Sequence, residues 1–378
     1  MKLSGLKVID LSVFLPGPYL TMCLADHGAE VIKIEPPGGG DPGRQIGLSD
    51  GDHTVFFRNL NRGKKSVVLN LKHDADREAL LGLCENADVF VESFRPGVVD
   101  RLGVGYQAVR ARNPGVVYCS ISAFGQDGPY RDRPAHDLAV EAIGGLLGMT
   151  LGRDGKPAIP GVPIADLLAA LQGLSGVLMA LLRRESTGLG DYIDIGMHDA
   201  VVAALPNILG PTLAEARHPV VQDERTTGGA AFYQVYDTAD GRQLVLGGQE
   251  EKFVKTLLSA FGRPDLAELC ARGPGPHQAP VKAFLRETFA ARTLQHWMDE
   301  LSQLDVCHGP VNTLPEAMAD PNAMARGMVT ADASGRRWLG PAIRFVAEPA
   351  EPVWRAPALG EHTAELLGRA DADAGSGS

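Results

Sequence analysis

The side chains best suited to chemistry are an aspartate and a histidine that stand 30 residues apart. Asp166 ends the apolar run Val-Pro-Ile-Ala and precedes a second apolar run, Leu-Leu-Ala-Ala-Leu. Because a polar group buried without a partner costs about 2–7 kcal/mol, an acid at this place needs a reason. The local pattern favours a helix N-cap, since Asp is a preferred cap residue and an apolar helix follows it. The alternative is a nucleophile, because a desolvated and positioned carboxylate can act as one.

His136 is the histidine of this pair, and it directly precedes Asp137. Histidine titrates near neutrality and serves as a general acid or base, although a lone histidine is more often structural. Glu250 and Glu251 follow the glycines of a predicted hairpin, and one of them could orient a histidine. The alternative for both glutamates is a solvated surface position.

The sequence lacks the motifs that several other kinds of catalysis require. The sequence has no Walker lysine motif, which leaves phosphoryl transfer without support. His27, His198 and His308 lack the spacing of paired metal ligands, so no metal site is expected.

Bulk composition narrows the class of protein further. The chain has 378 residues, 44% of them hydrophobic, and a formal net charge of −10, which argues against a nucleic-acid surface. Five cysteines without a CxxC pair indicate reduced thiols in a cytoplasmic protein. The N-terminus does not read as a signal peptide, and no apolar run is expected to reach the roughly 18 residues that span a bilayer.

The elements that must position Asp166 and His136 follow from the order of apolar runs. Strands are predicted at 6–12, 31–35, 65–71, 88–94, 116–125 and 191–197, and helical patterns separate most of them. This alternation predicts an α/β class with a Rossmann-like core and a parallel sheet, whose ligands bind at the carboxyl ends of the strands. No GxGxxG directly joins a strand to a helix, so no nicotinamide or flavin dinucleotide site is expected.

A second pattern begins near residue 225. Two alternating strands flank Asp240-Gly241, a standard hairpin turn pair, and three helices follow. We therefore expect a large Rossmann-like domain from residues 1–215 plus 320–370 and a smaller α+β domain over 225–315. Residues 371–378 are expected to be a disordered tail.

Basic residues of the first half follow the predicted strands, where a doubly wound sheet binds its ligand. They are Lys33, Arg44, Arg58, Arg62, Lys64, Lys65, Lys72, Arg95 and Arg101. Such a group would suit a polyanionic ligand such as a nucleotide or coenzyme A; the alternative is a solvated face.

The chain resembles the family III CoA-transferases, a superfamily that also contains the α-methylacyl-CoA racemases. The resemblance covers nearly the whole chain. The segments that carry it are LKVIDLSVFLPGPYLTMCLADHGAEVIKIE, NLNRGKKSVVLNLK, VFVESFRPGVVDRLG, SISAFGQDGPYRDRPAHD, IADLLAALQGLSGVLMALLRRESTGLGDYIDIGM and DPNAMARGMV.

The resemblance implies two reactions for the same site. In the transferases, an aspartate matching Asp166 attacks an acyl-CoA, forms a mixed anhydride and then an aspartyl-CoA thioester, and passes CoA to a carboxylic acid. In the racemases, the matching aspartate and a histidine matching His136 act as acid and base, and a glutamate matching Glu250 supports the histidine. His136, Glu250 and GGAAFY look like the racemases, whereas DGPYRDRPA and the Leu-Leu-Ala-Ala after Asp166 favour the transferases. We expect CoA transfer, with 2-methylacyl-CoA racemisation as the alternative.

The resemblance also implies the binding sites and partners. Leu69, Lys72, Phe94 and Arg101 match contacts for the nucleotide end of CoA. Pro36 stands where relatives often carry an arginine, and Arg44 is the candidate to compensate. CoA is expected as part of the substrate, with no permanently bound cofactor, and the resemblance implies an interlocked homodimer.

Overall fold

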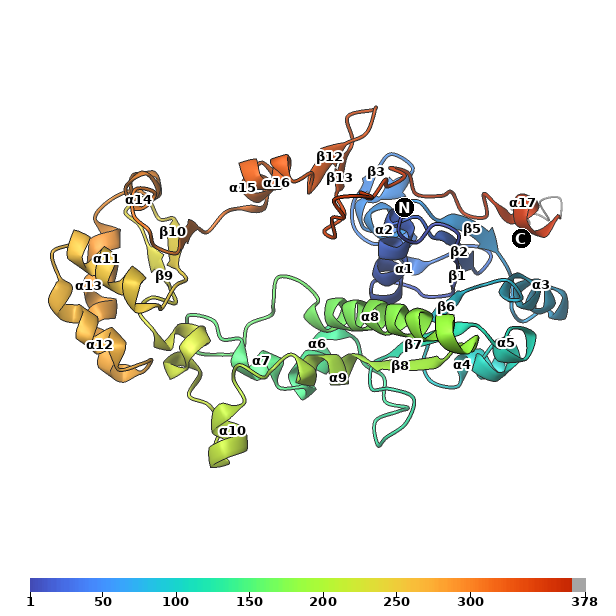
Figure 1. The fold of residues 1–378 in the computed structure, drawn as a ribbon, viewed down its shortest axis with the longest axis horizontal. Coiled ribbons are helices and arrows are strands. Elements are labelled where there is room, and N and C mark those ends of the chain that lie inside the picture. Colours follow the sequence, from blue (N-terminus) through green and yellow to red (C-terminus); the bar gives the residue numbers. More distant parts are fainter. Residues whose placement is uncertain (369–378) are drawn as a thin grey trace. The chain divides into compact units, whose positions relative to one another are not determined.

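The computed structural model describes residues 1–368, so the predicted tail at 371–378 lies outside the described residues. The chain forms two compact units (Figure 1). The first comprises Met1–Leu147, Ile159–Ala204 and Pro321–Ser378, and the second comprises Gly148–Ala158 and Leu205–Asp320. This division differs from the expected domain ranges because residues 148–158 and 205–215 join the smaller unit.

A six-stranded parallel sheet forms the centre of the first unit, with strand order β5-β2-β1-β6-β7-β8. The strands are β1 (Lys7–Asp10), β2 (Glu30–Glu35), β5 (Lys65–Val68), β6 (Val89–Glu92), β7 (Val117–Ser122) and β8 (Tyr192–Gly196). Counted within the sheet, this is the 3-2-1-4-5-6 order of a Rossmann fold, and its switch point lies between β1 and β6. The predicted α/β class with a Rossmann-like core is confirmed.

Helices cover both faces of this sheet (Figure 1). One face carries α1 (Pro16–Asp26), α6 (Asp137–Ile143), α8 (Ile164–Thr187) and α9 (Met197–Ala203). The other carries α3 (Asp74–Cys84), α4 (Val98–Arg101) and α5 (Tyr106–Arg112), and α17 (Thr363–Leu367) packs against β5. The remaining elements of this unit are β3 (Ser49–Asp50), β4 (His53–Thr54), α2 (Val55–Asn61), α16 (Pro321–Ala325), β12 (Val329–Ala331) and β13 (Arg337–Leu339), and α7 (Leu146–Met149) reaches the boundary between the units.

The turn from β1 into α1 is tightly built. Pro16 occupies the first helical position, where its missing N–H is not needed. A Cβ atom on Gly17 would lie 2.1 Å from the Cβ atom of Ser12, so only glycine allows this approach. Thr21 then donates its hydroxyl to Asp10 Oδ2 at 2.7 Å, which ties the helix to the end of the strand.

Helix α8 buries one face in the core and exposes the other. Ala169, Ala170 and Val177 are fully buried, whereas Met179 and Leu182 are 69% and 75% exposed. Within the described residues, α8 is long and apolar enough to cross a bilayer, which corrects the expectation that no apolar run reaches that length. Core helices of soluble proteins meet the same criterion, and α8 packs on β7, β8 and α1.

The second unit is a smaller α+β assembly. Its antiparallel sheet consists of β9 (Gln234–Asp237), β10 (Gln243–Leu246) and β11 (His308–Pro310). Its helices are α10 (Gly210–Glu215), α11 (Glu251–Ala260), α12 (Ala267–Ala271), α13 (Ala279–Ala290), α14 (Leu294–Leu301) and α15 (Leu314–Met318). The predicted hairpin between β9 and β10 is confirmed, and Gly241 supplies the positive φ of 74° that its turn requires.

Candidate active site

Asp166 lies in the first turn of α8, at the third helical position. The helix begins at Ile164 and its N-cap is Pro163, so Asp166 is not the cap, contrary to the local reading of the sequence. Burial raises the pKa of Asp166 to about 7, and the negative charges of Asp137 and Glu141 add to this shift. A carboxylate in such surroundings is poorly solvated, which is the condition that makes it reactive.

His136 stands directly before α6 as its N-cap residue, and its side chain is exposed. Its ring meets the ring of Phe14 edge-on, with centroids 6.1 Å apart. Phe14 follows β1 and adopts a φ of 63°, which is strained for a bulky residue. Strain of this kind is common at functional sites, and here it places an aromatic ring beside one of the two sequence-predicted residues.

Two acids of α6 belong to this site that sequence analysis did not select. Asp137 Oδ1 accepts the backbone N–H of Asp166 at 3.2 Å, and Glu141 Oε1 accepts the N–H of Ile164 at 2.9 Å. They stand four residues apart, so they share one face of α6. That like-charged pair on a short helix was the signal in the sequence that could have identified them.

The predicted CoA-contacting residues follow two strands of the sheet: Leu69 and Lys72 follow the edge strand β5, whereas Phe94 and Arg101 follow β6, beside the switch point. Leu69 follows β5 and is buried, Lys72 is exposed, and Phe94 follows β6. Arg101 ends α4 and is exposed. Val13 N–H donates to Ser93 Oγ at 3.0 Å, which links the two loops at the switch point. This is where doubly wound sheets bind ligands, and the four contacts themselves stay predictions.

A buried acid holds the loop that carries Phe94. The N–H of Phe94 donates to Glu92 Oε2 at 2.8 Å, and Ser120 donates its hydroxyl to Glu92 Oε1. Burial raises the pKa of Glu92 to about 7. Glu92 therefore supports the loop at the switch point from inside the sheet.

Six of the nine basic residues that follow the strands form ion pairs with acids of the same unit, four of them with buried acids, which corrects their interpretation as one ligand-binding group. Lys33 pairs with Asp41, Arg44 with Glu35, Arg58 with Asp50, Arg62 with Asp26, Lys64 with Asp10, and Lys65 with Glu30 and Glu365. Burial favours the neutral form of Asp10, but Lys64 and Lys33 outweigh it and hold the pKa of Asp10 below its ordinary value. Lys72, Arg95 and Arg101 form no ion pair within residues 1–368 and remain the cations available to a ligand.

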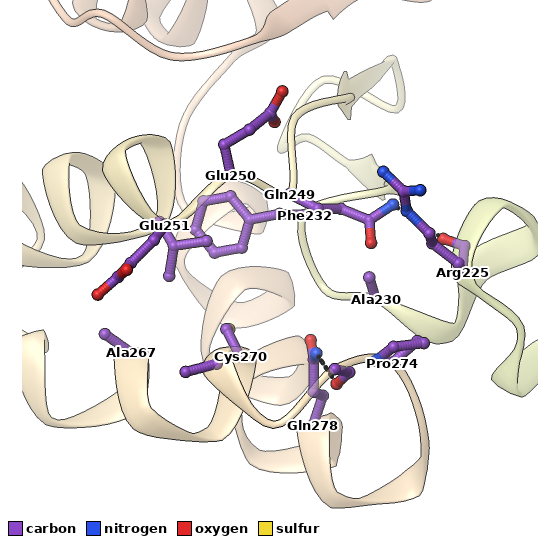
Figure 2. A pocket seen from close by; sticks show the side chains of 13 residues that line it. Arg225, Ala230, Phe232, Gln249, Glu250, Glu251, Ala267, Cys270, Pro274 and Gln278 are labelled. Carbon is purple, nitrogen blue, oxygen red and sulfur yellow. Dashed lines mark hydrogen bonds between the residues drawn. The ribbon is translucent and has the colours of Figure 1, made fainter.

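Glu250 lies in the second unit, at the N-cap position of α11, and its side chain is exposed. It borders a pocket of about 420 Å³ that is lined by Arg225, Phe232, Gln249 and Cys270 among others. Figure 2 shows the Glu250 carboxyl group pointing away from Phe232, whereas Gln249 reaches toward Arg225 and donates to its backbone oxygen at 3.0 Å. The support of His136 by Glu250 stays a prediction.

Within the described residues, no group of three or more His, Cys, Asp or Glu side chains is arranged to hold a metal ion. The five cysteines are free thiols.

Fold and site together define an α/β enzyme with a desolvated carboxyl group as its reactive feature. The sequence model of CoA-transferase family III matches residues 3–363. The chain is 37% identical to acetyl-CoA:oxalate CoA-transferase of Acetobacter aceti, over 86% of this chain and 85% of that protein. It is 34% identical to succinyl-CoA–D-citramalate CoA-transferase of Chloroflexus aurantiacus, over 97% of this chain and 93% of that protein.

A solved structure agrees with these sequence comparisons. The crystal structure of a CAIB/BAIF family protein from Brucella suis superposes with a TM-score of 0.82 at 31% identity, over 97% of this chain and 98% of that one. The chain belongs to CoA-transferase family III, and the expected resemblance is confirmed. It is an enzyme that transfers CoA between acyl-CoA thioesters and acids.

Proposed function

We propose that this transferase works through covalent catalysis by Asp166. The observation that carries the proposal is the position of this carboxyl group in the first turn of α8, where burial and two neighbouring acids raise its pKa to about 7. A carboxylate that water solvates poorly gains more from forming a covalent bond than an exposed one does. Racemisation is the weaker alternative, because it needs His136 as a partner base and the relatives reported above are transferases.

The proposed steps conserve charge. An oxygen atom of Asp166 attacks the carbonyl carbon of acyl-CoA, the carbon–sulfur bond breaks, and CoA leaves as a thiolate with the negative charge. The thiolate attacks the aspartyl carbon of the mixed anhydride, which releases the first acid and leaves an aspartyl-CoA thioester. The acceptor carboxylate then attacks this thioester, and the released thiolate takes the acceptor acyl group from Asp166.

We further propose that the acceptor is a short dicarboxylic acid. One relative is named for acetyl-CoA and oxalate and the other for succinyl-CoA and D-citramalate, so the acids paired with the acyl-CoA in the two names both carry two carboxyl groups. The exposed cations Lys72, Arg95 and Arg101 are assigned to CoA rather than to the acid, since all three follow the carboxyl ends of strands of the parallel sheet, and Arg95 and Arg101 lie beside the switch point.

The decisive experiment is mass spectrometry of the enzyme after incubation with succinyl-CoA. A mass increase equal to the acyl group or to CoA on the peptide that contains Asp166, removed by hydroxylamine and absent in Asp166→Asn, is expected. Exchange of the α-proton of a 2-methylacyl-CoA with D₂O, in the absence of any acceptor acid, would overturn the proposal in favour of racemisation.

The interlocked homodimer implied by the family also belongs to this proposal. Two apolar features of the first unit support it. The outer face of α8 exposes Leu171, Leu178, Met179 and Leu182. A groove of about 500 Å³, whose lining includes Met22, Phe56, Leu167 and Ile343, runs along the same unit and is mostly apolar. Large exposed apolar surfaces mark interaction sites, and a second copy of this chain is the occupant that we propose.

Light scattering tests the dimer. We expect a mass of twice the 40.1 kDa chain, and a shift toward a single chain in Leu182→Glu. Leu213→Glu is the matched control, because Leu213 on α10 is equally exposed, at 77% against 75%, and lies outside α8. A single-chain mass for the parent protein would refute this part of the proposal. A cytoplasmic location is likewise proposed, supported by five free thiols.

A further inference from the structure

Glu141 of α6 is a carboxyl group buried completely inside the first unit, at 0% exposure. Its Oε1 atom accepts the N–H of Ile164, the first residue of α8, at 2.9 Å. The first N–H groups of a helix have no partner within the helix, and Pro163 at the N-cap offers no side-chain acceptor. Glu141 therefore takes the place of a cap and fixes the turn that carries Asp166.

The second oxygen of Glu141 has a different environment. Oε2 has no hydrogen-bond donor within residues 1–368. Asp137 stands one helical turn before Glu141 on α6, and Asp137 itself accepts the N–H of Asp166. Burial is the main cause that raises the pKa of Glu141, and the negative charge of Asp137 adds to it. The carboxyl groups of Asp137, Glu141 and Asp166 are therefore all found at the first turn of α8.

No cation balances this group of acids in the part of the chain that the structure describes. The elements packed against α6 and α8 do carry other titratable side chains: Tyr19, Cys23 and Asp26 on α1, Cys119 on β7, Tyr192 and Asp194 on β8, and His198 and Asp199 on α9. Asp26 is paired with Arg62, and His198 lies 3.6 Å from Asp199. The pKa shift at Asp166 comes from burial, Asp137 and Glu141.

We infer that Glu141 is a positioning residue whose negative charge repels the free carboxylate of Asp166, and that this repulsion ends when Asp166 becomes acylated. The inference rests on the proposed role of Asp166 as nucleophile. In each acylation step the charge of Asp166 leaves with the departing thiolate or carboxylate. The anhydride and the thioester at Asp166 are neutral, so the repulsion by Glu141 ends in both covalent states. Glu141 therefore shifts the equilibrium toward the covalent enzyme and raises the basicity of the attacking carboxylate.

Glu141→Gln separates this role from the structural one. Glutamine keeps the size of the side chain and the oxygen that accepts the N–H of Ile164, but it removes the charge. We expect the acid limb of kcat/KM to move down by about one pH unit, because a carboxylate without this neighbour ionises more easily. We also expect the fraction of enzyme trapped as a hydroxylamine-sensitive adduct at pH 8 to fall about 5- to 10-fold. Glu185→Gln, at the exposed far end of α8, is the control and should change neither value.

Glu141→Asp provides the complementary test, since it keeps the charge but is too short to hold the same hydrogen bond. We expect its acid limb to stay within about 0.3 pH units of the parent. If Glu141→Gln and Glu141→Asp shift the limb equally, or if neither shifts it, the inference is refuted. If the parent enzyme itself forms no adduct, the failure lies instead with covalent catalysis by Asp166.

Discussion

Arg44 and Glu35 form a two-point ion pair in the interior of the first unit. Arg44 Nε lies 2.8 Å from Glu35 Oε2, and Arg44 Nη2 lies 2.7 Å from Glu35 Oε1. The guanidinium group also stacks over the ring of Phe57, 3.9 Å from its centroid, and donates to the backbone oxygen of Pro357. Burial favours the neutral form of Glu35, but Arg44 outweighs it and lowers the pKa of Glu35. A guanidinium held in this way is poorly placed to replace the arginine that is absent at Pro36.

Replacement of Arg44 should therefore affect stability more than CoA binding. Arg44→Ala leaves the Glu35 carboxylate buried without its partner, and we expect the free energy of unfolding to fall by about 3 kcal/mol. The KM for acyl-CoA should stay within about twofold of the parent value. Urea denaturation and initial-rate kinetics measure the two effects. A large rise in KM without a loss of stability would instead support Arg44 as a nucleotide contact.

Lys72→Ala should show the reverse pattern. Lys72 is exposed and forms no ion pair within residues 1–368, so its removal should leave the unfolding free energy unchanged. A charge-assisted contact to phosphate is worth about 1.4 kcal/mol or more, which corresponds to an increase of about tenfold in KM for acyl-CoA. The increase should shrink as salt is added, because exposed charges are screened. An unchanged KM at low salt would remove Lys72 from the CoA site.

The pH dependence of catalysis should report the ionisation of Asp166. In the proposed mechanism the deprotonated carboxylate attacks, and the pKa of Asp166 is raised to about 7. Consequently kcat/KM should be lost as the pH falls through about 7 and should level off above it. Initial rates between pH 5.5 and 9, with substrate ionisation measured separately, test this expectation. An acid limb near pH 4 would show that the carboxylate is ordinarily solvated in the working enzyme.

Because the pKa of Asp166 is raised in the folded protein, folding stability should depend on pH. Between about pH 4 and pH 7, folded Asp166 holds a proton that the unfolded chain has released, so folding stability falls as the pH rises through this window. Above about pH 7 Asp166 is ionised in both the folded and the unfolded state, and the loss of folding stability has reached its full size. Asp166→Asn removes the charge, and we expect it to be more stable than the parent by roughly 1–3 kcal/mol at pH 8.5, after a discount for partial exposure.

Urea denaturation at pH 6 and pH 8.5 measures this gain, which should be smaller at pH 6. Asp191→Asn is a suitable control, because Asp191 is an exposed aspartate of the same unit. A variant that is less stable than the parent at both values of pH would show that the Asp166 carboxylate serves the fold instead of straining it.

His136→Ala distinguishes the two reactions of the superfamily. The histidine side chain is exposed at the start of α6, and the proposed transfer steps give it no proton to move. We expect kcat for CoA transfer to fall less than about tenfold, against a loss of at least about 1,000-fold in Asp166→Asn. A matching loss in both variants would assign His136 an obligatory part in the reaction.

Local patterns in the sequence were sufficient to predict several of the strands on which the fold is built. Short apolar runs predicted β1, β2 and β6, and Asp240-Gly241 predicted the hairpin, because strand burial and turn chemistry are properties of neighbouring residues. The N-cap of α8 was placed three residues late, at Asp166 instead of Pro163. Its cap comes from Glu141, 23 residues earlier, and a reading that looks only at adjacent residues assigned the cap to Asp166.

Ion pairs over long sequence separations explain the misinterpreted basic residues. Lys64 meets Asp10 across 54 positions and Arg62 meets Asp26 across 36, and no local pattern distinguishes such a buried pair from a free surface charge. The proposal of Asp166 as nucleophile depends on the family resemblance. The residues alone left the cap and the nucleophile as alternatives, and the proposal is supported by the packing of α6 against α8, which places Asp137 and Glu141 at the first turn of α8.

The edge of the parallel sheet has a consequence for how this chain is made. His362 donates its N–H to Ser66 of β5, and Val68 N–H donates to Thr363 Oγ1 across 295 positions. A ribosome therefore releases β5 long before the segment that covers it exists. During synthesis this strand is an open edge for most of the translation time, and chaperones that shield open strands would act on the nascent chain in that interval.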